Sequence, residues 1–250
     1  MSWQAVALTH RGFVRPANED AIAVDGNIIK GEIPTALCFD LNLDQLRLMF
    51  ADGMGGHVNG ALASGAVLNF LAKHPADQFA EPGTCTASIR SANDHLYDLM
   101  QATPSTTGMG TTIVGVAFTK NGLLLFNVGD SRVYLHAPGS LIRLSVDDVP
   151  PVTIGASQRR TNHAITQALG GADRRTAITP HINQMSALAG HETILLCSDG
   201  LTDMLEDDAI CDVLDQCGEL STGVTELNLL AMQAGGRDNI SIVAVKLSAT

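Results

Sequence analysis

Short apolar segments that alternate with turn residues fill the middle of the chain. Between residues 111 and 144, the turn sequences KNG, GDS and APGS separate four segments rich in Val, Leu, Ile and Phe. Strands joined by such short turns are typical of an antiparallel meander. The pattern therefore predicts four consecutive strands, at residues 111–118, 123–128, 132–136 and 141–144.

Helical spacing of apolar residues occurs in two pairs of segments, one on each side of this meander. The predicted helices are residues 59–73 and 86–101, then 207–216 and 224–234. Further strands are predicted at residues 3–8, 20–24, 46–51, 193–197 and 240–247. Strands that neighbour in sequence look antiparallel and the helices come in pairs. This order favours an α+β fold, a central antiparallel β-sandwich with helices packed outside, over a parallel doubly wound sheet.

Two stretches show little periodicity. Residues 25–45 are interrupted by Gly31 and Pro34, and we assign them no function. Residues 145–162 contain two prolines. Since no Pro/Gly/Ser-rich linker divides the chain, we expect residues 1–250 to form a single domain.

Composition and charge narrow the classes of function. The net charge of −11 argues against a broad nucleic-acid footprint or attraction to anionic lipid, but suits a protein that binds cations. The five cysteines include no CxxC pair, so neither a disulfide framework nor a zinc site is indicated. No apolar run reaches the roughly 18 residues of a membrane span, and the first residues do not read as a leader. We expect a cytoplasmic protein.

Acidic residues recur where predicted strands begin or end. Asp52 follows an apolar run in FADGMGGH, and Asp199 follows another in TILLCSDG. Asp130 lies in NVGDSR, Asp238 precedes the last strand in GGRDNIS, and Glu19-Asp20 lies at the start of the second strand. Any one of these carboxylates can be a turn former that bonds its own backbone. Five such coincidences instead suggest one shared site.

Carboxylates that converge must be neutralised, because two like charges about 4 Å apart repel by roughly 4 kcal/mol at an effective dielectric near 20. Ligands that are all oxygens select Mg²⁺ or Mn²⁺, whereas zinc would bring in His or Cys. Two such ions bridged by Asp52 could hold a deprotonated water for attack on phosphorus. The Gly53 carbonyl could join the metal shell, and Gly55 and Gly56 would clear space for a phosphorylated side chain.

Arg15 lies in the loop that carries Glu19, four residues before it. Taken alone, it reads equally well as a solvated loop arginine. Beside a metal site, its guanidinium is a fork for two phosphate oxygens.

Six motifs occur in the order found in one enzyme family. RPANED, FADGMGG, the GTT of residues 110–112, VGDSRVY, CSDGLTD and GGRDNIS resemble those of metal-dependent protein serine/threonine phosphatases, the protein phosphatase 2C family, and look most like its bacterial branch. The resemblance extends from Leu8 to Val245. It implies a four-layer αββα fold and hydrolysis of phosphoserine or phosphothreonine on proteins.

The resemblance also implies roles for single residues. Asp52 and the Gly53 carbonyl would hold both Mn²⁺ or Mg²⁺ ions, Asp199 and Asp238 would complete the first ion's shell, and Glu19 would act through water at the second. Asp130 matches the aspartate that, with Asp199, holds a weaker third ion, and Arg15 matches the phosphate-binding arginine. Asp20 would shape the loop rather than bind a metal.

The chain departs from the family pattern at three places. Many eukaryotic relatives have a histidine, proposed as the general acid, where this chain has Met54, whose thioether cannot donate a proton. His57 is an alternative donor. The flap around residues 145–162 is shorter than in bacterial relatives, which puts substrate selection and the third ion in doubt, and residues 25–45 are longer.

Two other functions were weighed against a phosphatase. GMGGHV fails the GxGxxG spacing of a dinucleotide loop because Val58 takes the place of the third glycine. A phosphatase-like regulatory binding module, catalytically weak, would be expected to have lost metal aspartates, yet Asp52, Asp199 and Asp238 are present. For the phosphatase, we expect a phosphorylated protein as substrate, such as a serine/threonine kinase or its targets, no nucleic-acid or membrane partner, and a monomer.

Overall fold

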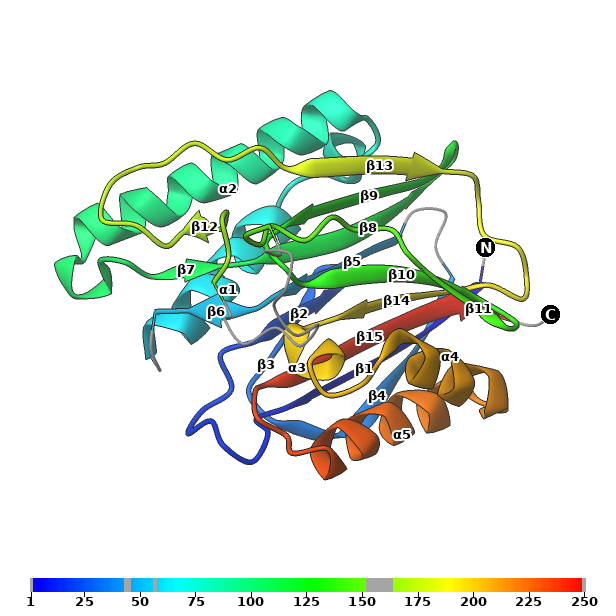
Figure 1. Cartoon of the computed structure of the whole chain (residues 1–250). Helices are drawn as coiled ribbons and strands as arrows, with labels where there is room; N and C mark the ends of the chain where they lie inside the picture. Colours follow the sequence, from blue (N-terminus) through cyan, green and yellow to red (C-terminus); the bar gives the residue numbers. More distant parts are fainter. Residues whose placement is uncertain (1, 43–45, 56–57, 152–163, 249–250) are drawn as a thin grey trace.

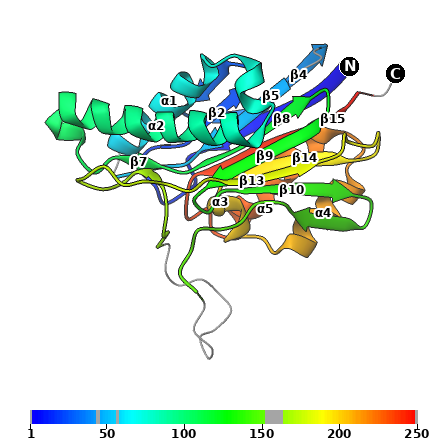
Figure 2. The ribbon, with the colours of Figure 1, turned by 90° about the horizontal axis from the view of Figure 1, so that it is seen from above.

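The structure is a computed structural model that describes residues 2–42, 46–55, 58–151 and 164–248. Two six-stranded sheets face each other in this part of the chain, and helices cover their outer faces (Figures 1 and 2). The strand pairs are antiparallel. This arrangement confirms the predicted α+β sandwich with its flanking helix pairs.

The sheets are built from strands that lie far apart in the sequence. The first sheet has the order β11 (Ser140–Arg143), β10 (Arg132–Ala137), β14 (Thr193–Cys197), β15 (Ile240–Leu247), β1 (Ser2–His10) and β4 (Ile33–Asn42). The second has the order β13 (His181–Met185), β9 (Gly122–Val128), β8 (Ile113–Thr119), β5 (Leu46–Ala51), β2 (Ala21–Val24) and β3 (Asn27–Lys30). A small sheet joins β12 (Leu169–Gly170), β7 (Gly110–Thr111) and β6 (Gly53–Met54).

Each large sheet carries one pair of helices. The second sheet packs against α1 (Val58–Ala72) and α2 (Pro82–Ala102), and the first packs against α4 (Asp207–Gln216) and α5 (Leu220–Gln233). Two 3-10 turns, Ala76–Phe79 and Pro104–Thr106, and the short α3 (Asp199–Thr202) complete the helical segments. None of the described helices combines the length and apolarity that a membrane span needs.

The central strands are apolar on both faces because both faces are covered. Along β1, Ala5 and Ala7 pack between the two sheets, whereas Val6 and Leu8 pack under α4 and α5. Successive strand residues point to opposite sides of a sheet, so such a strand reads as a continuous apolar run. Full burial of each large aliphatic side chain contributes about 1.5–3 kcal/mol.

The stretch of weak pattern between residues 25 and 45, for which the sequence predicted no element, forms two strands. It contains β3 and the whole of β4, with Gly31 at a φ of +76° in the turn between them. Both strands lie at sheet edges, where side chains are largely exposed and alternation is weak. Pro34 is tolerated in β4 because an edge strand has one side without ladder hydrogen bonds.

Candidate metal centre

The register of the second sheet brings Glu19 and Asp52 to one place. Ala21 at the start of β2 pairs with Ala51 at the end of β5. Glu19 precedes the first residue by two positions, and Asp52 directly follows the second. An antiparallel pair places the start of one strand beside the end of its neighbour, so both carboxylates emerge at the same edge.

The first sheet brings three more carboxylates together in the same way. Cys197 at the end of β14 pairs with Arg132 of β10 on one side and with Ile242 of β15 on the other. Asp199 follows this row of residues, whereas Asp130 and Asp238 precede it on the two antiparallel neighbours. The register therefore gathers them at one end of the sheet.

These two sets of strand ends border one cavity of about 240 Å³. Every site residue predicted from the sequence lines it: Arg15, Glu19, Asp52, Gly53, Asp130, Asp199 and Asp238. Thr112, Asn239 and Ile165 also lie in its wall. The convergence that the sequence only suggested is thus a feature of the structure.

The negatively charged carboxylates in and next to this cavity repel one another. Burial, followed by the charges of Asp20, Asp199, Asp238 and Asp130, raises the pKa of Asp52 well above its usual value. A carboxylate shifted in this direction favours its neutral form unless a cation compensates for it. The donor set consists of carboxylate and carbonyl oxygens, which suit Mg²⁺ or Mn²⁺.

Two glycines allow the backbone to approach Glu19 closely. A Cβ atom at Gly53 would collide with the carbonyl of Gly60 in α1, and one at Gly60 would collide with the Glu19 carboxylate. Only the absence of both side chains lets β6, α1 and the Glu19 loop meet. Gly60 was missed by the sequence analysis, because a single glycine in a helix of small residues carries no sign of such a contact.

The GTT motif holds the backbone of Asp52. The Asp52 N–H donates to Thr112 Oγ1 at 3.0 Å, and its carbonyl accepts from Thr112 N at 2.9 Å and from Thr111 Oγ1 at 2.7 Å. Thr112 Oγ1 also lies 2.7 Å from Ser131 Oγ, next to Asp130. The two threonines therefore tie the loop of Asp52 to the loop of Asp130.

Asn239 holds the backbone of the loop between β1 and β2 through its side-chain amide. Its Oδ1 accepts from the Glu19 N–H at 2.8 Å, while its Nδ2 donates to the carbonyls of Arg11 at 2.9 Å and Ala17 at 3.0 Å. Such hydrogen bonds each contribute about 0.5–1.5 kcal/mol and limit the loop to one geometry. Asn239 was not singled out from the sequence, although it directly follows Asp238 in GGRDNIS.

Arg15 reaches over the cavity from the β1–β2 loop. Its Nη2 lies 2.5 Å from Asp238 Oδ2, and about half of its side chain is exposed. The hydrogen bond with Asp238, more than any other contact, raises the pKa of the guanidinium. A charged fork held at the mouth of a cavity is suited to binding an anionic group.

Asp20 faces the interior of the sandwich rather than the cavity. Its Oδ2 accepts from Ser241 Oγ, which lies 2.7 Å from Thr9 Oγ1. Burial is the first cause that raises its pKa well above the usual value. These contacts connect Asp20 to β15 and β1, and its role in shaping the loop stays a prediction.

The glycine loop after Asp52 is described only in part. Met54 lines the cavity, and Gly55 has a φ of +118°, which favours glycine. Gly56 and His57 lie outside the described residues, as does most of the segment 145–162 that the sequence analysis interprets as a shortened flap.

Comparison with known proteins gives the same family from sequence and from structure. The family model of protein phosphatase 2C matches residues 37–227. Serine/threonine protein phosphatase PstP of Mycobacterium tuberculosis is 32% identical over 251 residues, an alignment that covers 95% of this chain and 43% of that protein. The chain thus spans less than half the length of this relative.

Two solved structures have the same fold over nearly all of the chain. The catalytic domain of PstP in complex with two manganese ions has a TM-score of 0.76 and 31% identity, covering 99% of this chain and 100% of that one. The S. agalactiae serine/threonine phosphatase has a TM-score of 0.81 and 27% identity, covering 98% and 100%. With the family model matching over most of its length and the acidic cavity in place, the chain belongs to the protein phosphatase 2C family.

Proposed function

We propose that this protein is a metal-dependent serine/threonine phosphatase that hydrolyses phosphoserine and phosphothreonine on proteins. The observation that carries the proposal is the single cavity that Glu19, Asp52, Asp130, Asp199 and Asp238 share, with Arg15 at its mouth. The similar PstP catalytic domain, described with two manganese ions, supports the same reading.

The ligand assignment follows the positions of the residues in the family motifs. Asp52 and the Gly53 carbonyl would hold two Mn²⁺ or Mg²⁺ ions, Asp199 and Asp238 would complete the shell of one, and Glu19 would act through water at the other. Asp130, with Asp199, would hold a weaker third ion. When bound, the ions supply Lewis acidity toward water and toward the phosphoryl group.

The protein's own side chains would position the substrate. Asp238, once engaged in metal binding, would give up its contact with Arg15, and the guanidinium fork would then be available for two phosphate oxygens. The hydrogen bonds of Thr111, Thr112 and Asn239 would keep Asp52 and Glu19 in place before substrate arrives. Such preorganisation reduces the rearrangement required in the transition state.

The setting of the reaction follows from the same proposal. The substrate would be a phosphorylated protein, such as a serine/threonine kinase or its targets. We propose a single catalytic domain over residues 1–250 that acts as a monomer in the cytoplasm. The cysteines, all free, suit a reducing compartment.

The test is phosphate release from a phosphothreonine peptide with Mn²⁺, with Mg²⁺ and with EDTA. Mn²⁺ or Mg²⁺ should support turnover and EDTA should abolish it. Asp52→Asn should reduce turnover by several orders of magnitude while the protein stays folded. The matched control is Asp40→Asn, the same change at an exposed position on β4, which should leave turnover unchanged.

The outcome separates an enzyme from a regulatory binding module. A module would show no turnover with any divalent ion and would still bind a phosphorylated partner. Full activity in Asp52→Asn would refute the proposed centre itself.

A further inference from the structure

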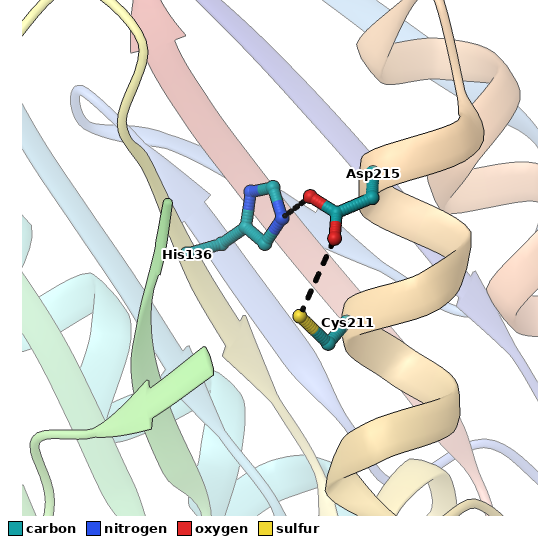
Figure 3. Close-up of side chains that lie close together, drawn as sticks. All are labelled: His136, Cys211 and Asp215. Atoms are coloured by element: carbon teal, nitrogen blue, oxygen red, sulfur yellow. Dashed lines mark hydrogen bonds and ion pairs between the residues drawn. The ribbon is translucent and has the colours of Figure 1, made fainter. Parts of the chain in front are cut away.

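A second cluster of potential metal ligands lies away from the acidic cavity. His136 is near the end of β10, and Cys211 and Asp215 are on α4 (Figure 3). Residues four apart in a helix share a face, so the thiol and the carboxylate both point toward the strand. One ligand atom from each of the three residues lies within 4.8 Å of the other two.

The contacts place the carboxylate between the imidazole and the thiol. His136 Nε2 lies 3.0 Å from Asp215 Oδ1, and Cys211 Sγ lies 3.8 Å from Asp215 Oδ2. The Gly139 N–H also donates to both carboxylate oxygens, at 3.1 and 3.0 Å. His136 and Cys211 are buried, whereas about a third of the Asp215 side chain is exposed.

We propose that His136, Cys211 and Asp215 form a binding site for a zinc ion, distinct from the oxygen-lined cavity. Imidazole nitrogen, thiolate sulfur and carboxylate oxygen are the three donor types that zinc uses in proteins. One thiolate and one carboxylate would neutralise the dication, with a neutral imidazole as the third ligand. The ligands lie on a strand and a helix, which hold geometry better than loops do.

The protonation states of Cys211 and Asp215 without metal are compatible with zinc binding. Burial, and then the charge of Asp215, raises the pKa of the Cys211 thiol, so the thiol is neutral without metal. The Gly139 N–H lowers the pKa of Asp215 and keeps its carboxylate charged. Zinc would displace the thiol proton, and its binding would therefore release protons and strengthen as pH rises.

The site has room for a fourth ligand. A cavity of about 240 Å³ lies beside it, lined by His136 and Asp215 together with His191, Cys217 and Lys246. Zinc with three protein ligands commonly completes its tetrahedron with water. A water from this cavity would take that place.

The zinc site and the acidic cavity lie at opposite ends of β10. Asp130 precedes the strand and His136 is near its far end, a separation of six residues, or about 20 Å at about 3.3 Å per residue. The donor sets also differ, because the described lining of the acidic cavity offers carboxylate and carbonyl oxygens and includes neither Cys nor His. Mg²⁺ prefers oxygen ligands and would not replace zinc at a thiolate.

Cobalt is the probe that reports the sulfur ligand directly. Metal-free full-length protein, kept reduced, would be titrated with Co²⁺ in excess Mg²⁺, which fills the oxygen-lined cavity. We expect a thiolate-to-cobalt charge-transfer band and the intense visible bands of four-coordinate cobalt, both lost on adding one equivalent of Zn²⁺. Cys211→Ser should remove the charge-transfer band, and Cys38→Ser, at an exposed thiol, should retain it.

Zinc affinity provides the second measurement. Loss of a residue that only supports a ligand typically reduces metal affinity by about 10–100-fold. We therefore expect Cys211→Ser and Asp215→Asn to weaken zinc binding by at least about 100-fold, with Cys38→Ser unchanged. Asp215 is partly exposed whereas Cys211 is buried, so the Asp215 variant should remain folded even if Cys211→Ser does not.

Three results would overturn the proposal. The first is the absence of a charge-transfer band in the wild-type protein. The second is equal zinc affinity in the wild type and Asp215→Asn. The third is a band that survives Cys211→Ser, which would assign the sulfur to a different cysteine. In each case, the three residues would be a hydrogen-bonded contact between α4 and the β10–β11 hairpin and no more.

Discussion

Gly60→Ala tests whether close packing around Glu19 sets the metal centre. In an ordinary helix, this substitution is stabilising, by about 0.5–1 kcal/mol, because glycine loses more backbone entropy on folding than alanine does. At Gly60, the new Cβ would collide with the Glu19 carboxylate and lie 2.9 Å from the backbone carbon of Gly53. Overpacking of this kind costs about 1–3 kcal/mol.

The two terms add to a net destabilisation of about 1 kcal/mol. For a chain of this size, that corresponds to a fall in Tm of about 2–4 °C. The side chain of Glu19 can move away from the new methyl group, whereas the Gly53 backbone cannot do so freely. We therefore expect Glu19 to be displaced and the Mn²⁺ concentration for half-maximal phosphatase activity to rise.

Gly83→Ala is the matched control for this substitution. Gly83 lies in the first turn of α2, and a Cβ there would meet nothing within 4 Å. It should raise the stability by about 0.5–1 kcal/mol and leave the Mn²⁺ titration unchanged. Thermal melting and an activity titration would be run on both variants. If Gly60→Ala were as stable as Gly83→Ala and had the wild-type titration, the packing argument would be wrong.

Further predictions concern the acidic cavity itself. Mn²⁺ at 100 times its Kd should stabilise the wild type by about 2.7 kcal/mol, which corresponds to a rise in Tm of about 5–11 °C. An equal rise in the Tm of Asp52→Asn would show that Asp52 does not hold the ion. Without metal, the raised pKa of Asp52 means that the folded state binds its proton more tightly than the unfolded chain does. This contribution to stability is fully present below about pH 4 and is lost as pH rises through the folded-state pKa. Urea unfolding in EDTA at several pH values should show the loss. An equal loss in Asp52→Asn would refute the assignment of the effect to Asp52. If Arg15 binds phosphate equally in the ground and transition states, Arg15→Ala should raise KM with kcat little changed. A loss mainly in kcat would assign it to the transition state. Asp130→Ala should keep two ions bound and slow turnover at least tenfold, about 1.4 kcal/mol in the barrier; full activity with the wild-type Mn²⁺ titration would remove Asp130 from the site.

Local patterns in the chain were enough to predict the candidate site. Asp52, Asp199 and Asp238 each lie near the end of an apolar strand and directly before a glycine or an asparagine, and this arrangement repeats in ordered motifs. Strand ends are where a folded sheet can present polar groups, so the site chemistry can be predicted from the local sequence around them. The central strands and the four main helices were predictable for a related reason, since their apolar periodicity reflects faces that must be buried.

Three edge strands and several contacts between distant segments required the folded structure. Of the four edge strands of the two large sheets, β11 was predicted as the last strand of the meander, whereas β3, β4 and β13 were missed. These three strands bury few side chains, and their hydrogen bonds to a neighbour leave no pattern in the sequence. The roles of Gly60 and Asn239 depend on neighbours that are distant in the chain. The contact of His136 with α4 is of the same kind. The helix begins 75 residues after β10 begins, and its packing against that strand is set by the whole core. The local sequence around a residue determines its propensity for helix or strand. Its contacts across the sandwich depend on how all the strands are buried together.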